Sequence, residues 1–232
     1  MAPVASPLPE GEDKVHAVGA MFDAIAPRYD LVNRVMTFRM DVAWRHKTLD
    51  SLDLPADASV LDIAAGTGDL CREMEKRALR PIALDLSGGM LRNARTGAPR
   101  VQADARYLPI ATASVDGVTC GLALRNLVDL NACFAEMARV LRPNGSLAIL
   151  EVSAPTNPVL ALGHRVYFGK VVPLIGGLLS VKSAYQYLPK SVAYLPPVPD
   201  LLAMIERAGF TGVERRQLSG GISQLITARR AG

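Results

Sequence analysis

The fold of this chain is decided by Asp62-Ile63-Ala64-Ala65-Gly66-Thr67-Gly68-Asp69, which follows the apolar run Val60-Leu61. A buried strand that opens into a glycine-rich turn before a helix is typical of nucleotide sites in open α/β sheets. A second acidic residue, Asp85, ends the apolar run Ile82-Ala83-Leu84, and a carboxylate there can accept hydrogen bonds from two ribose hydroxyls. Cys71 stands where the dinucleotide fingerprint has its third glycine, so the pattern favours an adenosine-bearing molecule other than NAD.

Strand-like and helix-like segments alternate on both sides of this turn. Strands are predicted over 59–64, 81–85, 100–104, 115–122 and 146–152, and helices from 69, over 87–96 and over 129–141. Ser87 has the side chain of a helix N-cap, and Pro143-Asn144-Gly145 is predicted to end the later helix and turn the chain. This alternation predicts a parallel sheet with helices on both faces.

The two ends of the chain differ from this pattern. Residues 1–13 are rich in proline and acid and are predicted to be a disordered tail, with a single domain over 14–232. Within that domain, 14–50 has the spacing of a helical cap, and 153–198 is an insertion rich in Pro, Gly and Tyr. A helix over 199–208 and strand-like runs at 213–218 and 222–228, joined near Gly220-Gly221, predict a closing antiparallel hairpin.

The composition sets broad limits. The 232 residues are 50% hydrophobic and 21% charged, which suits one α/β domain with a sizeable core. A net charge of +4 without long basic runs indicates either surplus surface arginine or an anionic partner such as a membrane surface, and no nucleic-acid partner is expected. Three cysteines and three histidines without metal-ligand spacing favour a reducing compartment and no metal site.

Acidic side chains follow several of the predicted strands. Asp62, Asp85 and Asp104 occupy successive strand ends, where the ligands of open α/β sheets bind. Their carboxylates suit a cofactor that has ribose hydroxyls, an adenine amino group and a cationic end. The alternative for any one of them is a solvated loop acid or a helix N-cap.

The glycine loop, Asp85 and the terminal hairpin resemble those of the class I S-adenosylmethionine-dependent methyltransferases. Within that class the chain resembles, over about residues 15 to 228, the C-methyltransferase family of menaquinone and ubiquinone biosynthesis. The runs that support this are 22–33 (FDAIAPRYDLVN), 61–69 (LDIAAGTGD), 124–126 (LRN), 142–145 (RPNG), 151–155 (EVSAP), 185–191 (YQYLPKS) and 208–210 (AGF).

The chain also departs from the family pattern. Positions that differ are Ala65 and Asn144 in place of glycines, Gly121 in place of a serine, Thr37, Arg39 and Asp41 in place of a Ser-x-Gly-x-His stretch, and 223–227, which lacks a histidine. These departures concern the quinol pocket more than the cofactor site.

The resemblance implies a Rossmann-like α/β fold with a mostly parallel seven-stranded sheet and a C-terminal antiparallel hairpin. It also implies S-adenosylmethionine as cofactor and C-methylation of a prenylated quinol, most simply demethylmenaquinol to menaquinol. A ubiquinone precursor, or another small lipophilic acceptor, is the alternative. The residues expected to contact the cofactor are Asp62, Gly66, Thr67, Gly68, Asp85, Leu86, Asp104 and Ala105.

Three residues are candidates for catalysis. Arg125 could lower the pKa of a ring hydroxyl, or it could form a salt bridge that shapes its loop. Asn126 could hold that hydroxyl or a water, or could cap a turn. Tyr29 could touch the cofactor's methionine part or the quinol, or could pack an entry helix.

Two segments could meet a lipid surface. Residues 158–181 supply apolar bulk bracketed by Lys170 and Lys182 but fall short of a spanning length, and residues 44–47 form a second basic, aromatic group. A lid over the active site explains the same residues. We therefore expect a cytoplasmic protein in peripheral contact with the inner face of the cell membrane, and the sequence leaves a homodimer open.

The residues disfavour two other functional classes. A short-chain NAD-dependent reductase would need a Tyr-x-x-x-Lys pair, and no tyrosine here has a lysine four positions on. A non-enzymatic protein with a degenerate nucleotide fold would be favoured by loss of Asp85 or of the glycine loop, and both are intact.

Overall fold

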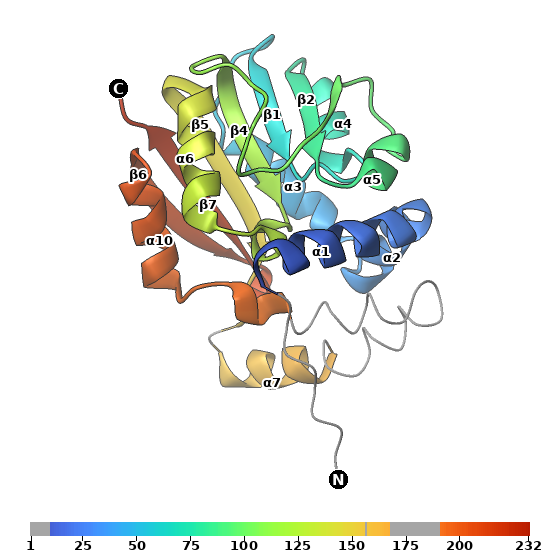
Figure 1. Cartoon of the computed structure of the whole chain (residues 1–232). Coiled ribbons are helices and arrows are strands. Elements are labelled where there is room, and N and C mark those ends of the chain that lie inside the picture. Colours follow the sequence, from blue (N-terminus) through green and yellow to red (C-terminus); the bar gives the residue numbers. More distant parts are fainter. Residues whose placement is uncertain (1–9, 156, 168–190) are drawn as a thin grey trace.

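The computed structural model describes residues 10–155, 157–167 and 191–232. Most of the predicted tail, Lys170, Lys182 and nearly all of the run at 185–191 therefore lie outside the described residues. The helical elements are α1 Gly11–Ile25, η1 Ala26–Arg28, α2 Tyr29–Met36, α3 Met40–Asp50, α4 Asp69–Glu75, α5 Gly88–Arg92, η2 Leu124–Asn126, α6 Leu130–Val140, α7 Pro158–Val166, η4 Val192–Tyr194, α10 Val198–Arg207 and η5 Ser219–Gly221 (Figure 1). The strands are β1 Ser59–Ile63, β2 Arg80–Asp85, β3 Arg100–Gln102, β4 Val115–Gly121, β5 Leu141–Val152, β6 Phe210–Leu218 and β7 Ser223–Arg230.

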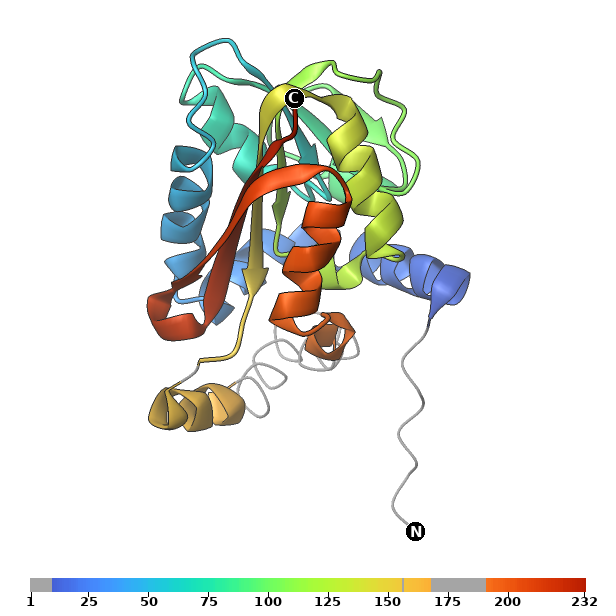
Figure 2. The ribbon, with the colours of Figure 1, turned by 90° about the vertical axis from the view of Figure 1, so that its left-hand side faces the viewer.

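One seven-stranded sheet, in the order β3-β2-β1-β4-β5-β7-β6, organises the molecule. The strands from β1 to β5 pair in parallel, whereas β7 pairs antiparallel with both β5 and β6 and forms the hairpin seen in Figure 2. The predicted fold class is thereby confirmed. The strand order reverses between β1 and β4, and in such sheets a ligand binds outside the carboxyl ends of the strands at this point.

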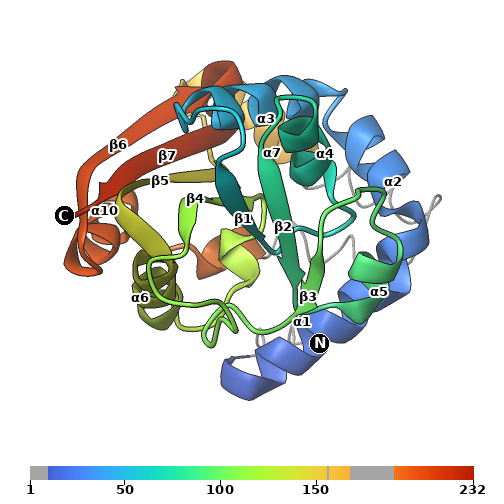
Figure 3. The same ribbon diagram turned by 90° about the horizontal axis from the view of Figure 1, so that it is seen from above.

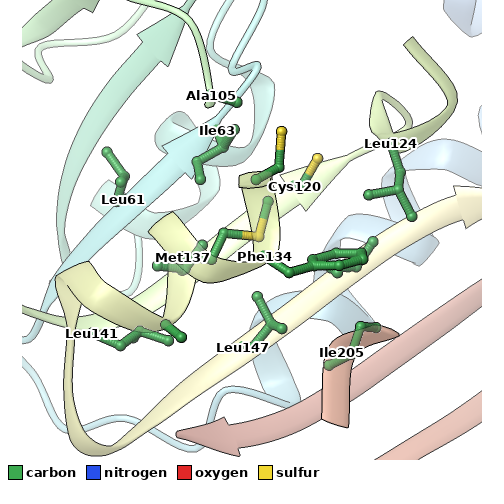
Figure 4. Packing of buried hydrophobic residues seen from close by; sticks show 14 of the residues in the cluster. Leu61, Ile63, Ala105, Cys120, Leu124, Phe134, Met137, Leu141, Leu147 and Ile205 are labelled. Atoms are coloured by element: carbon green, nitrogen blue, oxygen red, sulfur yellow. The ribbon is translucent and has the colours of Figure 1, made fainter. Parts of the chain in front are cut away.

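Helices cover both faces of the sheet, as the view from above shows (Figure 3). Alternate residues of β1 separate the two layers, since Leu61 and Ile63 join a core with Phe134 and Met137 of α6, while Val60 joins a core with α3 and α4. Figure 4 shows the first of these cores, in which Phe134 and Met137 are fully buried. Burial on both faces explains why the strands are nearly continuous apolar runs.

The N-terminal helices lie across the edge where the parallel strands end (Figure 1). Helix α1 is joined to that edge by Asp23, whose carboxylate accepts hydrogen bonds from the Ser87 hydroxyl at 2.5 Å and from the Gly89 amide at 2.7 Å. The Ser87 hydroxyl in turn accepts from the Met90 amide at 2.9 Å, which confirms Ser87 as the N-cap of α5.

Several predicted boundaries are wrong, and the helix predicted over 87–96, for example, ends at Arg92. Helix α1 begins at Gly11, so residues 11–13 belong to a helix rather than to the tail. Helix α6 ends at Val140 and β5 starts at once, so Pro143-Asn144-Gly145 do not separate them but lie inside β5. The pairing of β5 with β4 is irregular there and Asn144 has a φ of 62°, because proline cannot donate to the ladder and asparagine tolerates a left-handed conformation.

Candidate active site

The glycine loop connects β1 to α4 through three residues with positive φ, the first of which is Ala64 at 55°. Gly66 has a φ of 58° and Gly68, the N-cap of α4, a φ of 80°. A Cβ atom on Gly68 would lie 2.7 Å from the Thr96 side chain, so only glycine fits there without rearrangement. Gly66 lines a cavity at the strand ends, whereas Gly68 supports the turn from behind and lines none of the cavities described below.

Asp85 closes this loop from the end of β2. Its carboxylate accepts the Gly66 amide at 2.7 Å and the Ser87 amide at 2.8 Å, and burial raises its pKa. A carboxylate offers about four lone-pair positions, so two remain for hydroxyl groups of a ligand. Leu86 and Ala105 line the same narrow cavity, which passes under Val18 of α1. This arrangement fits the ribose and adenine of S-adenosylmethionine.

Asp62 lies deeper, beneath the loop. It is fully buried, accepts a hydrogen bond from the Thr119 hydroxyl at 2.7 Å, and burial raises its pKa to about 7. Together with Thr67, whose hydroxyl bonds to Asp30, it lines a second small cavity on the other side of Gly66. Asp62 and Thr67 therefore lie where the sequence placed them, next to the glycine loop.

Asp104 does not point into either cavity. Its carboxylate forms a bidentate pair with the Arg106 guanidinium, at 2.8 Å for the shortest contact, and accepts the Arg106 amide at 2.8 Å. The neighbouring Ala103 and Ala105 line the narrow cavity instead. Of the two alternatives for this acid, the geometry matches the loop acid, since Asp104 precedes a turn and no helix begins there.

A much larger cavity of about 390 Å³ opens beside the glycine loop. Its walls are mostly apolar and come from α1, α2, α3, η2, η4 and α7, together with the ends of β4 and β5. Tyr29 and Leu122 line this cavity and both smaller ones, so the three spaces meet at these two residues. Leu122 has a φ of 58°, an uncommon conformation for a branched residue that is often found at functional sites.

Arg125 lines the large cavity and is held by several partners. Its guanidinium pairs with the fully buried Glu151, donates to the Leu122 carbonyl at 2.8 Å and donates to the Ser191 hydroxyl at 3.1 Å. The Arg125 amide also donates to Glu151 at 3.0 Å. The salt bridge considered for this residue therefore exists, and it holds the guanidinium in place beside the cavity.

The turn that carries Arg125 is fixed from α1 as well. The Lys14 ammonium donates to the carbonyls of Arg125 at 3.0 Å and Leu127 at 2.9 Å, and it lies 3.7 Å from the centre of the Tyr194 ring. Burial lowers the pKa of Lys14 to about 8. Asn126, next in the turn, lines the narrow cavity rather than the large one.

Sequence reasoning missed Lys14 and Glu151. Glu151 lies in one of the runs that the chain shares with the family, but only its packing against Arg125 reveals a role for it. Lys14 lies 111 residues from Arg125, so no local pattern could have paired them.

Of the basic, aromatic group at 44–47, His46 and Lys47 are exposed, but Trp44 and Arg45 do not lie on the surface as a lipid contact would require, and Trp44 lines the large cavity. Trp44 is only 3% exposed and donates to the Ser219 hydroxyl at 2.8 Å, because α3 packs its face against the sheet. Its neighbour Arg45 is buried too, paired with Asp41 and Asp69. Cys120, in the apolar run of β4, is fully buried.

Neither a metal site nor a spanning helix is found in the described ranges. No three His, Cys, Asp or Glu side chains there lie close enough to hold a metal ion. No helix in the described part of the chain is both long and apolar enough to cross a bilayer.

Comparison with known proteins agrees with this geometry. The chain is 39% identical over 91% of its length to the ubiquinone/menaquinone biosynthesis C-methyltransferase UbiE of Syntrophotalea carbinolica, covering 93% of that protein. It is 40% identical over 95% of its length to the demethylmenaquinone methyltransferase of Mycolicibacterium vanbaalenii, covering 97%.

The fold also resembles a solved structure at low sequence identity. Phosphoethanolamine N-methyltransferase 2 of Haemonchus contortus, solved with S-adenosylhomocysteine, matches with a TM-score of 0.60 at 15% identity, covering 81% of this chain and 52% of that one. The sequence profile of the ubiE/COQ5 methyltransferase family matches residues 10–230. The chain therefore belongs to the ubiE/COQ5 methyltransferase family.

Proposed function

We propose that this enzyme methylates a ring carbon of a prenylated quinol, with demethylmenaquinol as the acceptor. Its methyl donor is S-adenosylmethionine, which when bound supplies a methyl group already activated by a sulfonium. The observation that carries the proposal is the meeting of the apolar cavity with the glycine-loop cleft at Tyr29 and Leu122. An apolar ring in the first space and a charged donor in the second would come together beside these two residues and Phe22, which also lines both spaces.

The residues of the junction suit a reaction that depends on alignment and desolvation. Arg125 holds a positive charge at the cavity wall, and a nearby cation favours loss of a proton from a ring hydroxyl, which enriches the ring carbon in electron density. Because Glu151 and Ser191 fix the Arg125 guanidinium, this side chain needs little reorganisation when negative charge develops on the ring. Asn126 lines the donor cleft and Tyr29 lines both spaces, which supports a role for each beside the reacting groups.

The acceptor's tail has a route out along the same cavity. Phe38 of the α2–α3 turn is 68% exposed and Val159 of α7 is 78% exposed, and both also line the cavity. Leu162, one turn along α7 from Val159, is 60% exposed and completes this exposed apolar rim, although it does not itself line the cavity. Contiguous exposed apolar residues around a pocket mouth are typical of membrane or lipid contact sites. We infer that the rim rests on the lipid surface that holds the isoprenoid tail.

The direct test is an assay with isotope-labelled donor and two reduced acceptors that carry the same short isoprenoid chain, demethylmenaquinol and the benzoquinol precursor of ubiquinone. Mass spectrometry locates the label on the product. We expect label on a ring carbon of the naphthoquinol and a lower rate with the benzoquinol. Label on neither ring would overturn the proposal. Faster methylation of the benzoquinol would show that the acceptor is a benzoquinol rather than a naphthoquinol. Light scattering in the same buffer tests the homodimer.

A further inference from the structure

Lys14 carries a buried ammonium that no carboxylate neutralises within the described residues. It lies near the start of α1 and is only 5% exposed. None of the ion pairs found in the described part of the chain includes it. Lysine is rarely buried without a paired acid, because desolvation disfavours its charged form. A lysine in this position therefore calls for an explanation.

The partners of this ammonium are backbone carbonyls and an aromatic ring. It donates to the carbonyl oxygens of Arg125 at 3.0 Å and Leu127 at 2.9 Å, and it lies 3.7 Å from the centre of the Tyr194 ring. Hydrogen bonds from a charged donor are roughly twice as strong as those between neutral groups. Lys14 therefore holds the backbone of η2 and of the residue that follows it.

The turn held by Lys14 contributes to both ligand spaces. Arg125 lines the apolar cavity, and Asn126 and Leu127 line the donor cleft. Lys14 itself lines neither of these spaces, nor the small cavity beneath the glycine loop. It can therefore act on the site only through the residues that it holds.

Arg125 is the residue of the turn that depends most on this support. Its backbone is held on both sides, because its amide donates to Glu151 at 3.0 Å and its carbonyl accepts from Lys14. Its guanidinium is bound at the other end by Glu151 and Ser191. A shift of the backbone would therefore either move the guanidinium along the cavity wall or break these contacts.

We propose that Lys14 is a positioning residue for methyl transfer, which places the Arg125 guanidinium beside the acceptor ring by holding the backbone of its turn. This inference rests on the proposed function and adds to it that activation of the ring depends on a group supplied by the N-terminal helix α1. Misplacement of a reacting group by about 1 Å can cost roughly 100-fold in rate. Loss of the Lys14 ammonium should therefore slow the reaction without emptying either ligand space.

The experiment is a double-mutant cycle on the rate of methylation. Lys14→Met removes the ammonium in two backgrounds, the wild type and Arg125→Met/Glu151→Gln, in which the ion pair is replaced. Glu12→Gln is the matched control, since Glu12 lies on the same turn of α1 and forms an exposed ion pair with Arg106. Rates are measured with labelled donor at saturating concentrations of donor and of short-chain demethylmenaquinol, below the lowest thermal midpoint of the set.

Binding is measured separately from the rate. Trp44, the single tryptophan, lines the apolar cavity, so its fluorescence reports the binding of a 1,4-naphthoquinone with a short isoprenoid chain. Calorimetry measures the affinity for S-adenosylhomocysteine, the donor without its methyl group. Lys14→Gln, which keeps a hydrogen-bond donor of shorter reach, takes the place of Lys14→Met in the cycle if the latter does not fold.

Lys14→Met should lower the rate about 10–100-fold in the wild type but less than about threefold where Arg125 is already replaced. The dissociation constants of the naphthoquinone and of S-adenosylhomocysteine should change by less than about threefold, because Lys14 lines none of the three spaces. Glu12→Gln should match the wild type, since an exposed ion pair contributes little.

A fall by the same factor in both backgrounds would overturn the inference, because Lys14 would then act independently of Arg125. An unchanged rate in Lys14→Met would overturn it as well, as would equal slowing by Glu12→Gln or loss of S-adenosylhomocysteine binding. Failure of both Lys14 variants to fold would make the residue structural and lead to the same conclusion. Failure of the wild type to methylate any quinol would instead overturn the proposed function.

Discussion

The donor cleft and the apolar cavity are adjacent but are built in opposite ways. In the cleft, buried carboxylates on two neighbouring strands accept hydrogen bonds from the protein, as Asp85 does from the Gly66 and Ser87 amides. The cavity draws its wall from helices α1, α2, α3 and α7 and from η2, and its polar groups bond mainly to the protein rather than facing inward. A charged ligand needs preplaced acceptors, whereas a lipid tail needs shape and dryness.

The two regions also differ in how their ligand-binding residues affect the stability of the protein. Buried carboxylates in the cleft cost free energy whenever no ligand offsets them. Apolar residues of the cavity wall cost little in the core but leave an exposed rim at its mouth. The two regions should therefore respond differently to charge, pH and lipid.

The largest expected effect concerns the Arg125–Glu151 ion pair. Among the described residues, it is the ion pair whose arginine lines the apolar cavity. Arg125→Met leaves Glu151 buried and unpaired, so we expect the free energy of unfolding to fall by roughly 3–5 kcal/mol. The rate of methylation should drop by roughly 10²–10⁴-fold, and less at high pH, where hydroxide ionises the quinol without help. Denaturant unfolding and the labelled-donor assay measure the two effects.

The double variant Arg125→Met/Glu151→Gln separates the two roles of this pair. Removing both charges should restore part of the stability, because no unpaired charge stays buried. Methylation should remain slow while donor affinity stays near that of the wild type. Recovery of activity along with stability would show that Arg125 only shapes its turn.

In the cleft, the pH dependence of the free energy of unfolding should show how much the burial of Asp62 destabilises the folded protein. Burial raises its pKa to about 7 from an ordinary 3.8, so the folded state holds a proton that the unfolded chain loses, and stability falls as pH rises through this range. Asp62→Asn should remove that loss and gain roughly 2–4 kcal/mol relative to wild type between pH 4 and pH 8, in unfolding measured without ligand. A stability difference that does not change with pH would contradict this assignment.

Asp85 should matter for the donor and not for the acceptor. Asp85→Ala should weaken S-adenosylmethionine binding by about 1.5–3 kcal/mol, measured by calorimetry, because hydrogen bonds to a charged group are lost. Quinone binding followed by Trp44 fluorescence should be unchanged, since Asp85 does not line the apolar cavity. Asp200→Ala, on the exposed first turn of α10, is the matched control. Unchanged donor affinity in Asp85→Ala would reject the cleft as the donor site.

The smallest effect should be at the rim. Phe38→Asp/Leu162→Asp should reduce recovery with anionic liposomes in flotation by a few-fold, because two exposed apolar contacts are removed. Tyr107→Asp is the control, since Tyr107 is 72% exposed on another loop and lines neither the cavity nor the cleft. Equal flotation of all three proteins would place membrane contact elsewhere.

The same contrast explains what the sequence could predict. The cleft was predictable because the glycine loop follows its strand directly within Asp62–Asp69 and Asp85 ends the next strand, and the parallel sheet follows from the strand–helix alternation. The cavity was not, because Lys14 and Glu151 reach Arg125 only after folding, and apolar wall residues look like any core residue in a sequence. Trp44 illustrates this, since basic neighbours made it look like a surface group although it packs inside.

The central claim is that donor and acceptor occupy separate spaces that meet at Tyr29 and Leu122. It is tested most directly by titrating the short-chain naphthoquinone against Trp44 fluorescence with and without saturating S-adenosylhomocysteine, the donor without its methyl group. We predict that the quinone quenches Trp44 in both cases with nearly the same dissociation constant, because the two ligands bind together. Displacement of the quinone by S-adenosylhomocysteine would show that both ligands compete for one space and would contradict the account.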